Sequence, residues 1–211
     1  DLLESAVNEE EYRDLPQPIR GAVENISEEF FSSRDPQIID LLLDQVMFKT
    51  LLQEADKHKS NFLKDLFTRQ IDLLNLKTVL RIKRMGLSRD FLKQVYLPGG
   101  SISFDRFSTN FEEPLESIIT ALSMTDYASL MEEGIRNWQE KGSASTLEKM
   151  ADDYITEYLR QRKWTPFGLE PLVGYLWAKE IEIKNIRLIL VGKINKLPAE
   201  AIRERIRNVY I

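Results

Sequence analysis

Residues 166–191 read PFGLEPLVGYLWAKEIEIKNIRLILV, and this stretch predicts one long α-helix. At about 100° per residue, its large apolar residues gather on one side of that helix. They are Leu172, Leu176, Ile183 and Leu190, extended into a broad arc by Val173, Trp177, Ile181 and Leu188. We expect this arc to face the protein core, with Glu182 and Asn185 on the opposite, solvated face.

Three charged residues interrupt the apolar arc, namely Glu180, Lys184 and Arg187. An ion buried without a partner costs several kcal/mol, so these residues must pair with one another or meet a partner. Glu180 and Lys184 stand four residues apart in the favourable orientation for a helical ion pair. Self-pairing inside this helix is therefore one prediction.

A second helix, predicted over residues 60–85, has the same unusual pattern. Lys77 and Arg81 intrude on its apolar face, and a shift of 107 residues brings Lys77 onto Lys184 at the same helical phase. A period this long exceeds the usual solenoid repeats, so we expect duplicated helical subdomains packed side by side. The loop at Pro98-Gly99-Gly100 is the predicted boundary, which gives domains over residues 1–98 and 99–211.

Residues that commonly begin or end helices are frequent along the chain, and the alternation of apolar and polar residues typical of strands is nearly absent. Caps, prolines and glycines predict further helices, and all-α is the class that this pattern supports. The expected helices cover residues 35–59, 60–85, a short stretch from 88, 114–123, 125–141, 145–162, 166–191 and 198–210, with two short helices in the first 34 residues.

Composition excludes several functions. The 211 residues have a net charge of −5 and no block of basic residues, which argues against a duplex nucleic-acid partner. There is no cysteine, and the longest uncharged run, residues 94–104, is about half of a membrane span. The chain begins at Asp1 in the middle of a pattern, so we expect that an N-terminal part is missing.

No catalytic or cofactor-binding motif can be written from these residues. The single histidine, His58, lies in a charged helix end, and Gly99-Gly100 is not followed by a phosphate-binding lysine. We therefore expect no catalytic residue, no metal site and no cofactor. The charges on the two long helices remain: Lys77, Arg81, Glu180, Lys184 and Arg187. They form either a structural ion-pair network or the lining of a polar cavity that receives another subunit, and the residues alone leave both readings open.

The C-terminal run carries a family resemblance. Leu169 to Tyr175, then Lys179 to Arg187 with its Lys-Asn-Ile-Arg, then Gly192-Lys193, resembles the C subunit of archaeal and bacterial vacuolar-type (V/A-type) rotary ATPases. The vacuolar d subunit is the eukaryotic counterpart. The resemblance implies three repeated helical units in a funnel-like arrangement, of which two are found here. It also suggests an N-terminally truncated fragment.

The resemblance implies a structural protein and no enzyme. Such a protein joins the central axle to the membrane proteolipid ring, transmits torque for proton or sodium transport, and lies peripherally on the cytoplasmic face without entering the bilayer. A generic helical scaffold or regulatory module with an unrelated partner is the alternative, and an enzyme of unrecognised type is a third hypothesis.

Overall fold

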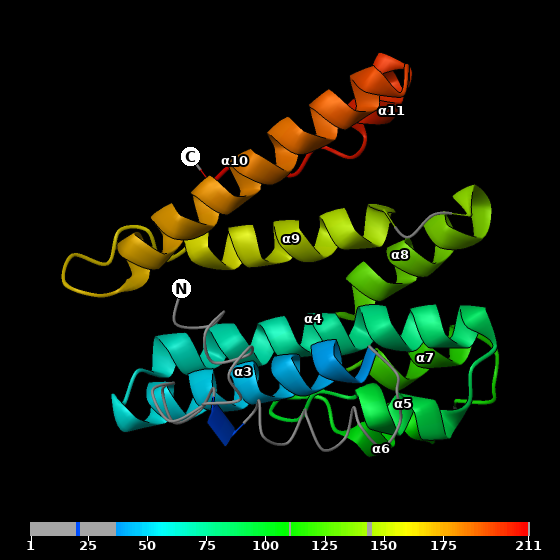
Figure 1. Ribbon diagram of the computed structural model, residues 1–211, viewed down its shortest axis with the longest axis horizontal. Helices are drawn as coiled ribbons and strands as arrows, with labels where there is room; N and C mark the ends of the chain where they lie inside the picture. Colours follow the sequence, from blue (N-terminus) through cyan, green and yellow to red (C-terminus); the bar gives the residue numbers. More distant parts are fainter. Residues whose placement is uncertain (1–19, 22–36, 110, 143–144, 211) are drawn as a thin grey trace, which may run out of the picture. The chain divides into compact units, whose positions relative to one another are not determined.

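A computed structural model describes residues 20–21, 37–109, 111–142 and 145–210 (Figure 1). Within these ranges there are nine helices and no strand, which confirms the all-α prediction. The two short helices predicted over residues 1–34 lie, apart from residues 20–21, outside the described part of the chain. The helices are α3 Gln37–Lys57, α4 Asn61–Met85, α5 Arg89–Val95, α6 Phe104–Ser108, α7 Glu116–Leu122, α8 Ala128–Lys141, α9 Ser145–Arg160, α10 Glu170–Ile194 and α11 Ala199–Arg203.

Local sequence signals fix the ends of α4 and α5 as predicted. The Ser60 hydroxyl accepts a hydrogen bond from the Leu63 amide at 3.3 Å, and the Ser88 hydroxyl accepts one from the Phe91 amide at 3.2 Å. Both are N-caps that satisfy an otherwise free amide of the first helical turn. Gly86 ends α4 with a φ of +67°, a conformation that favours glycine.

The described residues form two compact units. The first contains residues up to Asp72 together with Lys93–Ser103, and the second contains Leu73–Leu92 and the residues from Phe104 onward. The helix α4 contributes to both units, its first half to one and its second half to the other. The predicted domain boundary at residues 98 and 99 stays a prediction.

A buried carboxylate organises the first unit. Asp72 is fully buried, and its oxygens accept hydrogen bonds from the Ser101 hydroxyl at 2.5 Å and from the Ile102 amide at 3.1 Å. Gly100 lies so close to this carboxylate that a Cβ atom there would collide with it. The loop predicted at Pro98-Gly99-Gly100 is therefore fastened to α4 from the inside.

The second unit has a core made mostly by α7, α8 and α9 with the second half of α4. The helix α7 packs against α8, α8 packs against α9, and α9 packs against α10. The fully buried apolar side chains of these elements include Leu76, Leu80, Leu122, Met131, Ile135, Leu147, Ile155 and Leu159. By contrast, Ile181 is the only large apolar side chain of α10 that is buried.

The bounds of α10 differ from the prediction. The helix begins at Glu170 instead of Pro166, with Pro171 in its first turn, and it continues through Gly192 to Ile194. Gly192 does not end the helix because it serves packing: a Cβ atom there would lie 2.8 Å from the Cγ1 atom of Ile202. The glycine permits close approach of α11, and the helix runs on past it.

The last predicted helix, residues 198–210, is also too long. Only Ala199–Arg203 is helical, two turn-type hydrogen bonds follow it at residues 205 and 206, and residues 207–210 have no secondary structure. The Asn185 amide explains the difference, because its Oδ1 accepts from the Arg207 amide at 2.9 Å and its Nδ2 donates to the Arg207 carbonyl at 3.1 Å. These bonds replace those that helix continuation would have supplied.

Candidate functional site

The candidate site lies in the second unit and is centred on Asp152 of α9. The helix α9 is amphipathic, with Ala151, Ile155 and Leu159 buried on its inner side. Asp152 follows Ala151 at the edge of that side, and 14% of its side chain is exposed. A carboxylate that is so largely buried needs cationic partners.

Two cations bind Asp152 directly. The Lys184 ammonium of α10 lies 3.3 Å from Asp152 Oδ1, and the Arg207 Nε atom lies 3.0 Å from Asp152 Oδ2. The Arg207 side chain is as buried as its partner, with 14% exposed. Asp152 thus joins α9, α10 and the C-terminal segment through one carboxylate.

Lys77 of α4 is a third cation on which the negative charge of Asp152 acts. Burial lowers the pKa of the Lys77 ammonium below its usual value. The carboxylates of Asp152 and Glu148 oppose this shift, while the cations Lys184 and Arg81 reinforce it. The burial of Lys77 therefore outweighs the attraction of its acidic neighbours.

Two more exposed pairs surround this centre. Glu180 Oε1 lies 3.1 Å from the Lys184 ammonium, with 57% of the glutamate side chain exposed. Arg81 lies 3.6 Å from Glu148 Oε1, with 61% of the arginine side chain exposed. We call Asp152, Lys184, Arg207, Lys77, Glu180, Arg81 and Glu148 the Asp152 cluster.

Four of the five predicted residues meet in this cluster: Lys77, Arg81, Glu180 and Lys184. Arg187 is elsewhere, exposed on α10 beside a separate pocket. Sequence reasoning missed Asp152, Glu148 and Arg207. Their signals were weak, because Asp152 is followed by Asp153 and the pair resembles the solvated edge of an ordinary helix.

The buried face of α10 is not the predicted one. Gly174, Ile181, Asn185 and Gly192 are its buried residues. The predicted core residues Leu172, Leu176, Ile183 and Leu190 are 55–60% exposed. Asn185, predicted on the solvated face, is 9% exposed because it binds both backbone groups of Arg207. With Gly174 and Gly192, Asn185 marks the side of α10 where the rest of the chain approaches most closely.

The cluster suits a structural role within a rigid body. Trp177 donates to the Thr156 hydroxyl at 2.9 Å, and the Lys184 ammonium lies 5.2 Å from the centre of the Trp177 ring. The Asn208 amide donates to Asp153 at 2.7 Å. Charge, hydrogen bonds and ring contact therefore hold α9, α10 and the C-terminal segment together.

Lys77→Met should stabilise the chain by about 1 kcal/mol at pH 7, because the methionine keeps the volume and removes a poorly solvated charge. The unfolded chain binds more protons than the folded chain between the lowered folded pKa and the ordinary lysine pKa. The free energy of unfolding of the wild type should therefore increase with pH through that window, whereas that of the variant should not.

Urea unfolding at pH 7 and pH 10 measures both the stability change and its pH dependence. Lys93→Met, at an exposed lysine, is the control. A destabilised Lys77→Met protein at pH 7 would show that Asp152 needs this cation.

Glu180→Ala should change stability by less than about 1 kcal/mol, since the pair with Lys184 is exposed and Lys184 keeps Asp152. A thermal melt checks it. Glu182→Ala is the control: it breaks a similarly exposed pair, in which Glu182 Oε2 lies 2.8 Å from the Lys179 ammonium, and it should change stability as little as Glu180→Ala does. A loss of several kcal/mol from Glu180→Ala alone would mean that this carboxylate is part of the buried centre.

Within the described ranges, no group of three or more His, Cys, Asp and Glu side chains is arranged to hold a metal ion. His58 is 71% exposed at its helix end, beside Glu54. None of the helices in the described part of the chain has the length and apolar character needed to cross a membrane.

Comparisons with known proteins add the family context. The sequence model described as "ATP synthase (C/AC39) subunit" matches residues 1–205. The chain is 28% identical to the C subunit of the V-type sodium ATPase of Enterococcus hirae over 210 residues, which is 100% of this chain and 63% of that protein. It is 34% identical to the C subunit of the A-type ATP synthase of Methanocaldococcus jannaschii over 138 residues, covering 63% of this chain and 34% of that one.

A third relative, the C subunit of the A-type ATP synthase of Pyrococcus furiosus, is 30% identical over 174 residues, or 80% of this chain and 46% of its own length. The chain thus spans between about a third and two thirds of these relatives. No solved structure matches it significantly.

Proposed function

We propose, from the premise that this chain belongs to the ATP synthase (C/AC39) subunit family, that it is a non-catalytic central-stalk component of a rotary ATPase or ATP synthase. It couples the rotating axle to the membrane proteolipid ring and transmits torque for proton or sodium transport. The family membership confirms the resemblance stated from residues 169–193. The match over residues 1–205 is the observation that carries the proposal.

The construction of the second unit supports a load-bearing role. A part that passes torque must resist deformation, and close-packed helices have low compressibility. The Asp152 cluster adds ion pairs that join α9 to α10 and to the C-terminal segment. These contacts involve residues up to 55 positions apart in sequence, so they oppose the separation of distant segments.

The proposed place is the cytoplasmic face of the membrane, where the protein is peripheral and touches the ring without inserting. Charged and apolar residues share the outer surface of α10, which suits a protein that meets other subunits through broad surfaces. The partners under this proposal are the axle subunits and the proteolipid ring.

Co-purification tests the proposal. The protein is tagged in its own host, and the complex is purified from detergent-solubilised membranes. We expect both axle subunits and ring proteolipid to be retained at a fixed ratio. Retention of neither would reject the proposal and favour a helical scaffold with an unrelated partner. A tagged peripheral protein from the same membranes serves as the control for non-specific retention.

A further inference from the structure

The loop between α9 and α10 exposes large apolar side chains. Residues 161–169 read QRKWTPFGL, and we call them the aromatic loop. Trp164 is 82% exposed, Phe167 is 99% exposed and Leu169 is 47% exposed. Figure 1 shows the loop extending beyond the ends of both helices that it joins. Exposed apolar side chains of this size, grouped on one loop, mark a surface that contacts a partner or a membrane.

The backbone of the aromatic loop has a defined shape. The Thr165 amide donates to the Arg162 carbonyl at 3.1 Å, which closes a turn with Trp164 at its third position. Pro166 then fixes one backbone angle directly before Phe167. Because this backbone is already ordered, transferring the two aromatic rings out of water costs little further conformational entropy.

Positive charge is concentrated beside these rings. Residues 158–169 contain Arg160, Arg162 and Lys163 and no Asp or Glu, a local net charge of +3 in a chain that carries −5. Arg160 pairs with Glu157 at 3.2 Å in an exposed contact. The Lys163 ammonium lies 4.9 Å from the centre of the Trp164 ring. The aromatic loop therefore combines apolar rings with cations next to them.

The exposed apolar surface continues onto the first turns of α10. Leu172 and Leu176 are 57% and 60% exposed and stand one helical turn apart on the same side. Between Trp164 and Leu176, Glu170 is the only charged residue. It occupies the first turn of α10, close to Gly168 and beside the positive end of the helix dipole.

We propose that the aromatic loop docks on the headgroup layer of an anionic lipid bilayer. Trp164 and Phe167 lie at the level of the headgroups, and Arg162 and Lys163 contact lipid phosphates. The contact reaches only this layer, so α9 and α10 stay outside the hydrocarbon. The proposed function gives the protein a contact with the ring and none with lipid, so the lipid contact is an addition to it.

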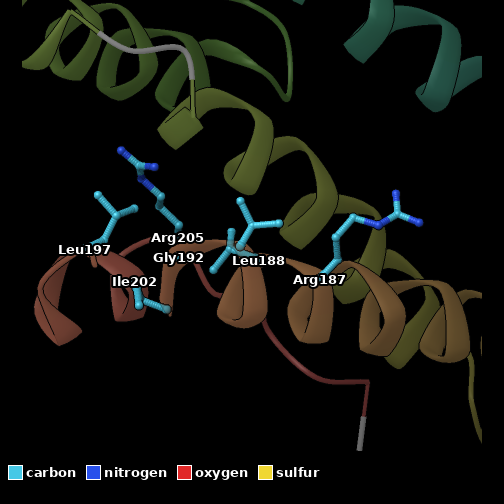
Figure 2. A pocket seen from close by; sticks show the side chains of 7 residues that line it. Arg187, Leu188, Gly192, Leu197, Ile202 and Arg205 are labelled. Atoms are coloured by element: carbon cyan, nitrogen blue, oxygen red, sulfur yellow. The ribbon is translucent and has the colours of Figure 1, made fainter. Parts of the chain in front are cut away.

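The observations favour a bilayer over a protein as the occupant. Protein partners bind most tightly where side chains fill concave pockets. A pocket of about 260 Å³ lies near the other end of α10, where Leu188, Gly192 and Ile202 are among its lining residues (Figure 2). No residue of the aromatic loop lines it. The loop protrudes instead, and a bilayer receives a protrusion without a matching shape. Tryptophan beside lysine and arginine is typical of membrane interfaces.

Vesicle binding tests the lipid contact directly. The purified protein is sedimented with vesicles of phosphatidylcholine in which about a third of the lipid is phosphatidylglycerol, and with vesicles of phosphatidylcholine alone. We expect about tenfold tighter binding to the anionic vesicles, weakened by added salt. Equal binding to both kinds of vesicle, or binding to neither, would overturn the proposal and leave a protein as the partner of the loop.

The fluorescence of Trp164 reports where the loop lies. Trp138 is only 8% exposed, and Trp177 donates to the Thr156 hydroxyl, so Trp164 dominates any change on binding. Its emission should shift to shorter wavelength on anionic vesicles. Spin labels near the headgroup should quench it more than labels at the ends of the acyl chains. Trp164→Phe should still bind but lose the shift. Binding without a shift, or stronger quenching by the deep labels, would contradict the proposed placement.

Substitution of the rings tests the apolar part of the contact. Trp164→Ala combined with Phe167→Ala should weaken binding to anionic vesicles about tenfold. The melting temperature should stay unchanged, because both side chains are exposed. Met124→Ala, at a residue that is 90% exposed in another loop, is the matched control and should bind like the wild type. Unchanged binding of the double variant would overturn the proposal.

Charge reversal tests the cations. Lys163→Glu should weaken binding to anionic vesicles severalfold. Lys193→Glu makes the same charge change at an exposed lysine near the other end of α10 and should bind like the wild type. Equal losses in the two variants would mean that overall charge, and not the loop, attracts the protein to lipid. No other subunit is present in these assays. A protein that retains axle and ring but ignores vesicles therefore overturns the lipid contact alone, whereas one that binds vesicles but retains neither rejects the proposed function alone.

Discussion

Asp152→Ala is expected to lower the free energy of unfolding by about 3 kcal/mol. The carboxylate is largely buried and binds Lys184 and Arg207 at 3.3 and 3.0 Å. Its removal leaves Arg207 buried without a charged partner among the described residues and deprives Lys77 of its principal opposite charge. The loss is larger than that of an exposed pair because water cannot replace the missing carboxylate.

Urea unfolding at neutral pH measures the Asp152 effect. Asp152→Asn keeps an oxygen acceptor and the volume, so it should lie between Asp152→Ala and the wild type. Glu140→Ala, at an exposed carboxylate on α8, is the matched control and should change stability by less than about 0.5 kcal/mol. If Asp152→Ala unfolds like the control, the cluster does not hold these segments together.

Asp72→Ala should destabilise the first unit by about 3 kcal/mol. The substitution leaves the buried Ile102 amide without its acceptor in a place closed to water, and it removes the partner of the Ser101 hydroxyl, which belongs to an exposed residue. It also opens a void against Gly100, which has no side chain to fill it. The loop at residues 98–102 should then separate from α4 more often.

Hydrogen exchange reports the Asp72 effect locally. The Ile102 amide should exchange at least tenfold faster in Asp72→Ala than in the wild type, together with the loss of global stability. Tyr96, whose hydroxyl donates to the Ile102 carbonyl at 2.7 Å, gives a milder comparison through Tyr96→Phe. An unchanged Ile102 exchange rate would show that the carboxylate does not fasten the loop.

The helices were predictable from sequence where a local signal decides them. Ser60, Gly86 and Ser88 act within one turn of their own helix, and each lies at the end it was expected to mark. Pro198 begins the last helix as expected, but Gly192 does not end α10, and α11 ends earlier than predicted, because tertiary contacts outweighed the local rule. Packing of Ile202 on Gly192 and the bonds of Asn185 to Arg207 decide those positions.

The orientation of α10 could not be predicted from periodicity. Apolar residues occur on both of its sides, so the pattern does not distinguish the face that packs in this chain from the face that stays exposed. Close approach decides it, through Gly174 beneath the Tyr210 hydroxyl and Gly192 beneath Ile202. The apolar residues of this face were recognised in the sequence, but they were predicted to be core and are exposed in the structure.

The Asp152 cluster was half predictable. The same helical phase of Lys77 and Lys184 indicated a shared environment: Lys184 pairs with Asp152, and the charge of the same carboxylate acts on Lys77. The carboxylate itself gave no signal, because a buried aspartate differs from a solvated one only in what the rest of the fold brings to it.

The coupling of hydrolysis to ion transport is the most direct measure of the proposed role. The rotary complex is purified from a host that lacks this protein, reconstituted into vesicles and supplied with ATP, with and without the purified protein. We predict that ATP hydrolysis persists without it while ATP-driven ion uptake is lost, and that adding the protein restores uptake. Full uptake in its absence would contradict the coupling role.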